Sequence, residues 1–419
     1  MNRRDFIKTA ASAGALGCTF DRGGESEIGR PWGGWREGHF QIHVIYTGVC
    51  ESLFLVFPDS TSMLIDCGDH AACKRGELAV PIMPDLSRHA GEWISRYVRD
   101  VNPRGAAVDY MLLTHYHADH AGNQVFHAGR SKNGRYFLSG FGEAIEYLDF
   151  RYAIDRAWPM FDDPVPMDAG YDNGVIANMR EVYRELERRG CKVERFRLEK
   201  GSDQIRPLHG EVEGFRTVPL CANGRVLHSD GQIEDVMGPL IAANPGGKVN
   251  ENPMSIGLRF EYGPFRFFTA GDFAHHQWKP GRVLFEAEGE LAKVCGRCQV
   301  AKINHHGHHS MPLSLVKALR SQVYLAGIWE QLHVTRDTMR NLANRKGYFG
   351  ERIFAPGVFT ARRRKEDALE SWLAEVEPSV FEPSHVVVDV APSGTEYSLF
   401  TLDAKDESRI VKSKRVFIS

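Results

Sequence analysis

The pattern of apolar and polar positions near the start of the chain predicts three consecutive β-strands. Apolar runs separated by short Thr-Gly and Pro-Asp breaks, which favour turns, occupy residues 41–46, 52–57 and 62–66. The Asp-Cys-Gly of residues 66–68 follows the third run. Asp66 is therefore a candidate to orient a ligand imidazole or a loop backbone. The alternative is an aspartate that only caps a turn.

The same pattern predicts helices among further strands. Apolar residues have helical spacing over 88–98 and, most clearly, over 175–186, where Gly190 is expected to end the helix. The aromatic stretch 143–158 is also expected to be helical. We therefore predict an α+β fold with a helical insertion at about 130–200. This insertion either walls a site or packs as an ordinary subdomain.

Three predicted strands end in residue types that bind metal ions. The apolar run 110–113 leads into His115, His117, Asp119 and His120. Two later runs lead into Asp272 and into the pair His305 and His306. His115 and His117, two residues apart in an extended segment, can point to the same side and share one ion. Asp119 and His120 are then placed to hold a neighbouring ion.

Composition and charge narrow the classes of function. The chain has 419 residues, of which 42% are hydrophobic and 25% charged, so it can bury a substantial core in one large domain or two. No stretch is apolar enough to predict a transmembrane helix. The net charge of −2 provides no overall basic field, which counts against tight, sequence-independent binding of nucleic acid. The basic run 362–365 is either a local phosphate-steering patch or a solvated helix start.

The N-terminus resembles a twin-arginine export signal. Arg3 and Arg4 precede a mildly apolar run of small residues that ends at Cys18. We therefore expect an exported protein, either periplasmic or anchored at the cell envelope by a lipid on Cys18. The alternative is a short basic amphipathic helix on a cytosolic protein. Residues 1–30 are excluded from the fold, and residues 31–419 are predicted to form the folded domain.

The ligand motifs resemble those of the metallo-β-lactamase superfamily over roughly residues 40–345. The residues that carry the resemblance are the HxHxDH of 115–120, Asp66-Cys67-Gly68, Asn252-x-x-Ser255, Thr269 to Asp272, Ile303 to Gly307, and His333. Within the superfamily they resemble the ComEC/Rec2 competence-protein branch. The resemblance implies an αββα sandwich with a binuclear site at the edge of its two sheets.

The resemblance also implies roles for the residues. His115 and His117 bind the first metal, Asp119, His120 and His305 bind the second, and Asp272 bridges them. His306 is the second choice for the place given to His305. The ions are expected to be Zn²⁺, with Mn²⁺ as the alternative. Superfamily members often have another histidine on the first metal. His209 and His228 flank the expected position without matching it, so water could complete that site.

The implied chemistry is hydrolysis by a hydroxide that bridges the two metals. Asp119 and His333 are the expected catalytic residues, with His333 contacting an oxyanion or donating a proton to the leaving group. A loop histidine with satisfied hydrogen bonds is the alternative for His333. The favoured substrate is a phosphodiester, either nucleic acid or a phosphorylated envelope component. Two alternatives stay open, namely a lactam, lactone or thioester hydrolase and a non-catalytic metal-binding sensor module.

Overall fold

The computed structural model describes residues 27–70, 79–167, 174–243, 249–274, 287–344 and 351–419. The predicted export signal and Cys18 lie outside the described residues, so export and lipid anchoring stay predictions. Among the described helices, none combines the length and the apolar character that a membrane crossing requires.

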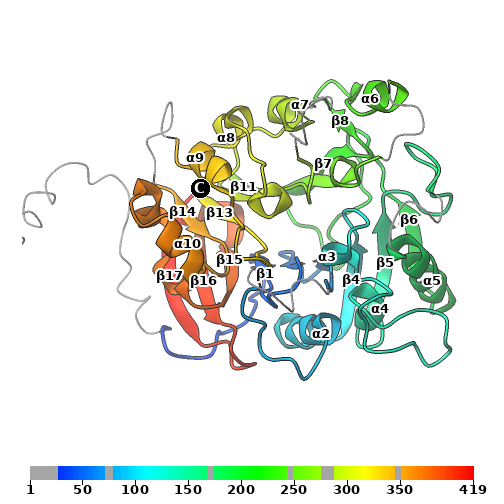
Figure 1. Ribbon diagram of the computed structural model, residues 1–419, viewed down its shortest axis with the longest axis horizontal. Coiled ribbons are helices and arrows are strands. Elements are labelled where there is room, and N and C mark those ends of the chain that lie inside the picture. Colours follow the sequence, from blue (N-terminus) through cyan, green and yellow to red (C-terminus); the bar gives the residue numbers. More distant parts are fainter. Residues whose placement is uncertain (1–26, 71–78, 168–173, 244–248, 275–286, 345–350) are drawn as a thin grey trace, which may run out of the picture.

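Two mixed β-sheets form the centre of the molecule (Figure 1). The first sheet has nine strands in the order β17-β16-β15-β1-β2-β3-β4-β5-β6. Their bounds are β1 (Phe40–Val44), β2 (Leu53–Val56), β3 (Ser62–Ile65), β4 (Ala107–Leu112), β5 (Asp149–Asp155), β6 (Lys192–Arg195), β15 (Ser384–Val390), β16 (Glu396–Asp403) and β17 (Val411–Ile418). The first three strands lie where the sequence predicts them.

The second sheet has eight strands in the order β14-β13-β12-β11-β10-β7-β8-β9. Their bounds are β7 (Phe215–Ala222), β8 (Arg225–Leu227), β9 (Ile233–Asp235), β10 (Gly257–Tyr262), β11 (Phe265–Thr269), β12 (Val300–Lys302), β13 (Val323–Leu325) and β14 (Ile353–Ala355). Strands β11, β12, β13 and β14 run parallel to one another, so their carboxyl ends meet at one edge of the sheet.

Helices cover the outer face of each sheet (Figure 1). The first sheet packs against α2 (Ala90–Val101), α4 (Phe141–Ala144) and α5 (Val175–Arg188). The second packs against α7 (Ala287–Val294), α8 (Leu313–Leu319) and α9 (Arg336–Leu342). The remaining helical turns are α3 (Ala118–Ala121), α6 (Gly238–Ala242), α10 (Ala361–Glu366), η3 (Asn252–Met254), η4 (Asn304–Gly307), η5 (Ser371–Glu375), η6 (Pro378–Phe381) and η7 (Pro392–Gly394).

Alternation of side chains along the strands divides the core into layers. In β13, for example, Val323 and Leu325 belong to the cluster between the two sheets, whereas Tyr324 belongs to the cluster under α8 and α9. Apolar side chains on both faces explain why these central strands have continuous apolar sequences. The four layers, helix, sheet, sheet and helix, confirm the predicted α+β sandwich of the αββα type.

The segment 130–200 differs in part from the predicted helical insertion. Helix α5 confirms the prediction from its apolar spacing. Residues 149–155, expected to be helical, instead form β5, which pairs in parallel with β4 on one side and β6 on the other. Ala153 packs in the layer under the helices and its neighbour Ile154 in the layer between the sheets, the alternation expected of a strand. This segment therefore extends the first sheet.

This extension contributes directly to the loop that follows β4. The carboxylate of Asp155, at the end of β5, accepts hydrogen bonds from the hydroxyls of Tyr116 and of Tyr183 on α5. Tyr116 lies between His115 and His117. Asp155 therefore fixes the backbone from which both histidines project.

We expect Tyr183→Phe to lower the free energy of unfolding by about 1.5–3 kcal/mol, because it removes one hydrogen bond, 2.9 Å long, to a buried carboxylate. Urea denaturation measures the change. Tyr147→Phe is the matched control, since Tyr147 is 37% exposed in the same segment, and it should change stability little. Equal effects of the two substitutions would contradict the role given to Asp155.

Candidate metal centre

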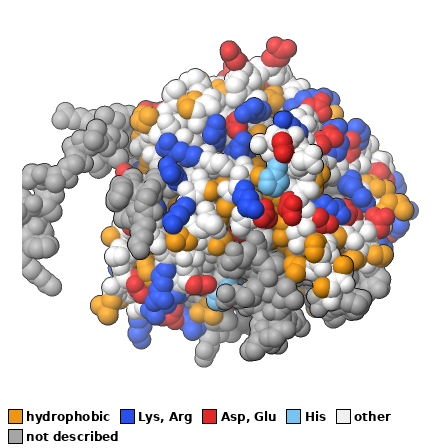
Figure 2. Space-filling view, turned by 90° about the horizontal axis from the view of Figure 1, so that it is seen from above, with side chains coloured by type: hydrophobic (Ala, Val, Ile, Leu, Met, Phe, Trp, Pro, Cys, Tyr) orange, Lys and Arg blue, Asp and Glu red, His pale blue; other side chains and the backbone are white. Residues whose placement is uncertain are grey.

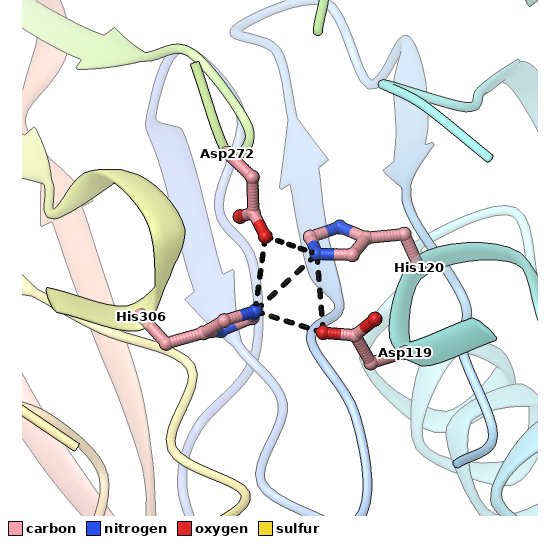
Figure 3. Close-up of side chains that lie close together, drawn as sticks. All are labelled: Asp119, His120, Asp272 and His306. Carbon is pink, nitrogen blue, oxygen red and sulfur yellow. Dashed lines mark hydrogen bonds and ion pairs between the residues drawn. The ribbon is translucent and has the colours of Figure 1, made fainter. Parts of the chain in front are cut away.

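Four ligand-type atoms converge where β4, β11 and β12 end (Figure 3). His306 Nε2 lies 2.9 Å from Asp119 Oδ2, 3.3 Å from Asp272 Oδ2 and 3.3 Å from His120 Nε2. His120 Nε2 lies 3.2 Å from Asp272 Oδ2 and 3.5 Å from Asp119 Oδ2. Donor atoms around a tetrahedral Zn²⁺ with bonds near 2.0–2.1 Å are separated by about 3.3 Å. The group therefore has the dimensions of a metal site.

A second group of ligand atoms shares Asp272 with the first. It consists of His115, His117 and Asp272. His115 Nε2 lies 3.0 Å from His117 Nδ1 and 3.8 Å from Asp272 Oδ2. The two histidines point to the same side of the chain, as the sequence predicts. Asp272 Oδ2 thus lies between the two groups.

The structure brings His306 into the first group and leaves His305 outside it. His305 Nε2 instead lies 3.0 Å from the amide Nδ2 of Asn252. Both histidines have left-handed backbone conformations, with φ of 49° and 51°, so the chain turns sharply here and the second ring faces the site. The preference for His305 relied on its nearness to the strand end. It could not anticipate two successive left-handed residues, which are uncommon and costly.

Buried partners fix the orientation of the ligands. Asp66 Oδ2 lies 2.7 Å from His120 Nδ1, and its other oxygen accepts the backbone N–H of Thr114 at 2.8 Å. Asp66 therefore contacts both an imidazole of the first group and the loop backbone, which favours the orienting role over an aspartate that only caps a turn. Gly68, two residues later, lets the backbone pass close to that of Asp119, because a Cβ at this position would lie 1.9 Å from the carbonyl oxygen of Asp119. Ser255 Oγ accepts the backbone N–H of Asp272 at 3.1 Å.

A buried ion pair, which the sequence analysis missed, lies behind the ligands. The ammonium of Lys302 is 2.6 Å from Glu51 Oε1, 2.6 Å from the carbonyl oxygen of Gly271 and 3.7 Å from Asp272 Oδ1. The other oxygen of Glu51 lies 3.1 Å from His306 Nδ1. Lys302 and Glu51 therefore support both Asp272 and His306. The available signal was a lysine at the end of the apolar strand Val300–Lys302, four residues before His306.

The crowding of charges shifts the pKa values of these groups. Burial alone would lower the pKa of His120 and of His306, but Asp272 and Asp119 outweigh burial and hold both pKa values well above the usual value. Burial alone would also lower the pKa of Lys302, but the nearby carboxylates of Glu51 and Asp272 outweigh burial and raise it. Burial and the neighbouring imidazoles of His120 and His117 lower the pKa of His115 well below its usual value.

Of the other predicted site residues, His333 lies beside the first group, whereas His209 and His228 lie away from both groups. His333 is buried beside the first group, with its ring stacked on that of His306 at a centroid distance of 5.1 Å. His209 Nε2 pairs with Asp109 at 2.9 Å, and His228 Nε2 lies 4.0 Å from Glu290, so neither joins the ligand groups.

The predicted basic run begins helix α10. Arg363 is buried against Asp367, and Arg362 pairs with Glu366. Arg362, Arg364 and Lys365 are exposed, which agrees with a solvated helix start.

The residues fit the divalent ions that the resemblance implies. Asp272 Oδ1 is buried and has no hydrogen-bond partner among the described residues. Ring nitrogens of His115 and His117 face one another at 3.0 Å, and those of His120 and His306 at 3.3 Å. Without a cation, each pair needs a proton on one of its two nitrogens to form a hydrogen bond. A cation accepts lone pairs from both nitrogens and from the carboxylates. The mixed nitrogen and oxygen donors suit Zn²⁺ and also permit Mn²⁺.

Comparison with known families agrees with this chemistry. A family model described as the metallo-beta-lactamase superfamily matches residues 47–124, which contain β2 to α3 and the HxHxDH motif. The search of curated proteins gave no match. The family match and the His/Asp cluster together support a metal-dependent hydrolase. The ComEC/Rec2 branch stays a prediction.

We expect His306→Ala to weaken Zn²⁺ binding at least about 100-fold, since changing even an outer partner of a ligand costs about 10–100-fold. Competition with a chromophoric chelator measures the affinity. His305→Ala is the matched control and should leave the affinity nearly unchanged. The assignment of His306 would be overturned if His305→Ala caused the larger loss.

We expect Lys302→Met to lower the free energy of unfolding of the chelator-treated protein by about 3–5 kcal/mol, because it leaves buried Glu51 without its cation. Lys293 pairs with Glu290 but its side chain is 60% exposed, so Lys293→Met should cost less than about 1 kcal/mol. Denaturant titration in the presence of chelator gives both values. A loss for Lys302→Met as small as for the control would show that the buried pair contributes little.

Proposed function

We propose that the protein is a binuclear metallohydrolase that cleaves phosphodiesters. The observation that carries the proposal is the sharing of Asp272 by two groups of ligand atoms. His115 and His117 would hold one ion, and Asp119, His120 and His306 would hold the other. One carboxylate between two such groups suits a pair of cations roughly 3.5–4 Å apart.

Charge balance supports two ions rather than one. Four buried carboxylates contact the histidine rings, namely Asp66, Asp119, Asp272 and Glu51. Among the described residues, Lys302 is the one buried ammonium beside them. With neutral imidazoles, three net negative charges remain in a space that excludes most water. A single divalent ion leaves the site negative. Two divalent ions and one small anion bring it to neutrality, which buried charges require.

The chain's own residues then have separate tasks. Bound divalent ions supply an acidified water as nucleophile and polarise a phosphoryl oxygen. Asp66 fixes the ring of His120, and Glu51 with the carbonyl oxygen of Gly327 fixes the ring of His306. Asp119 would hold the second ion through its carboxylate, and its backbone carbonyl accepts the N–H of Glu51. No side chain has to act as nucleophile.

A phosphodiester is the substrate that a pair of ions suits best, because two cations can stabilise both the attacking and the leaving oxygen. The charge of the protein surface gives little support for binding a polymeric phosphodiester. On the face seen in Figure 2, basic and acidic side chains are interspersed, so this face offers no continuous basic track for a long nucleic acid. We therefore favour recognition of the phosphodiester by the metal centre over recognition of a polymer by its charge.

We expect the Zn²⁺- or Mn²⁺-loaded protein to hydrolyse bis-p-nitrophenyl phosphate, and Asp272→Asn to lower the rate at least about 100-fold, since the shared ligand matters more than an outer partner. Release of p-nitrophenol measures the rate. Asp337→Asn, which changes an exposed carboxylate paired with His309, is the control and should keep the rate.

Two further substrates separate the alternatives. Single-stranded DNA tests a polymeric phosphodiester, and nitrocefin tests a lactam. Cleavage of nitrocefin alone would replace the proposal by the lactam, lactone or thioester hydrolase. Metal uptake without turnover of any substrate would replace it by the sensor module.

A further inference from the structure

A third group of ligand-type side chains lies outside the shared-carboxylate centre. It consists of His308, Glu330 and His333, whose donor atoms lie within 4.8 Å of one another. We call it the His308–Glu330–His333 trio. His308 comes from the turn after β12, and the other two come from the segment after β13. Two loops that are separate in sequence therefore bring these side chains together.

The hydrogen bonding of His333 is unusual for its burial. His333 is 3% exposed, and its Nδ1 is buried without a hydrogen-bond partner among the described residues. Its Nε2 faces Glu330 Oε1 at 3.8 Å, which is too long for a hydrogen bond. Within the described part of the chain, no hydrogen bond satisfies the carboxylate of Glu330 or the ring nitrogens of His308. Glu330 and His308 are only partly buried and can bond to water, whereas the buried Nδ1 of His333 needs a partner. A buried imidazole left open beside two ligand-type side chains indicates a ligand.

The neighbouring histidine provides an internal comparison. His309 adjoins His308 in sequence, but its Nδ1 is 2.8 Å from Asp337 Oδ2 and its side chain is 56% exposed. His309 thus forms an ordinary surface pair. The trio differs because its groups face one another without forming such a pair.

We propose that the trio binds a third divalent cation, for which Zn²⁺ is the best fit. Two imidazoles and one carboxylate are a ligand set of zinc sites that keep an open fourth position. A tetrahedral Zn²⁺ needs donor atoms about 3.3 Å apart, so the trio, with 3.8 Å between His333 and Glu330 and all three atoms within 4.8 Å, has to close around the ion. The ring of His333 stacks on that of His306 at a centroid distance of 5.1 Å with 13° between their planes. Because imidazole lone pairs lie in the ring plane, two nearly parallel rings would hold different ions.

This third ion would change the role expected of His333. As a ligand, His333 no longer serves as a proton donor. One carboxylate with a divalent ion leaves a net positive charge beside the shared-carboxylate centre, where it would attract an anionic substrate. This last step rests on the proposed phosphodiesterase function, whereas binding of the ion does not.

The test is the number of ions bound per chain. Each protein is dialysed against buffered Zn²⁺ and its bound metal is measured by mass spectrometry. Glu330→Gln and His308→Ala should each bind one ion fewer than the unchanged protein, and His309→Ala should bind the same number. The difference is the readout, so the result does not depend on whether the shared-carboxylate centre holds one ion or two.

The other outcomes are equally clear. Unchanged metal content in Glu330→Gln and His308→Ala would overturn the proposal. A loss of more than one ion, with an unfolding transition like that of His309→Ala, would also overturn it, because the trio would then belong to the centre at Asp272. If His306→Ala retains one ion that Glu330→Gln removes, the trio is an independent site. Failure of the phosphodiesterase assay leaves each of these results intact.

Discussion

Buried negative charge at the strand ends is the constraint on which the centre of this protein depends. Asp119 and Asp272 both place an oxygen within 3.3 Å of His306 Nε2, with almost no exposure to water. Carboxylates at this separation repel one another unless cations lie between them. Lys302 supplies one fixed cation, and protons on imidazoles supply others when metal is absent. Divalent ions satisfy the same requirement more completely, because they also accept the histidine lone pairs.

The sandwich makes this concentration of charge sustainable. Parallel strands deliver their following loops to one edge, and the apolar layers on both sides hold those loops in place. The loops carry strain that an isolated chain would not keep, including left-handed conformations at Asp66, His305 and His306. Each of these residues contacts the ligand group or the loop beside it. The unusual backbone conformations therefore occur in the loops whose side chains point into the candidate metal centre.

The sequence predicted the layers better than the details within the site. Apolar runs ending in His115, Asp272 and His306 were enough to locate the metal centre, because strand ends and ligand types are both local signals. The choice of His306 over His305 depends on backbone angles that no local pattern encodes. Strand β5 was mistaken for a helix because its aromatic residues suit both structures, and only pairing with β4 decides between them. Glu51 joins the centre through a contact distant in sequence.

The family match covers only part of the candidate metal centre. The match ends at residue 124, so it includes the HxHxDH motif and neither Asp272 nor His306. Those two candidate ligands come from the second sheet, more than a hundred residues later, and still lie close to His120 at distances that suit one metal ion. The HxHxDH motif alone does not require Asp272 and His306 to lie beside it. The closure of the ligand group across both sheets therefore supports a working metal centre independently of the motif.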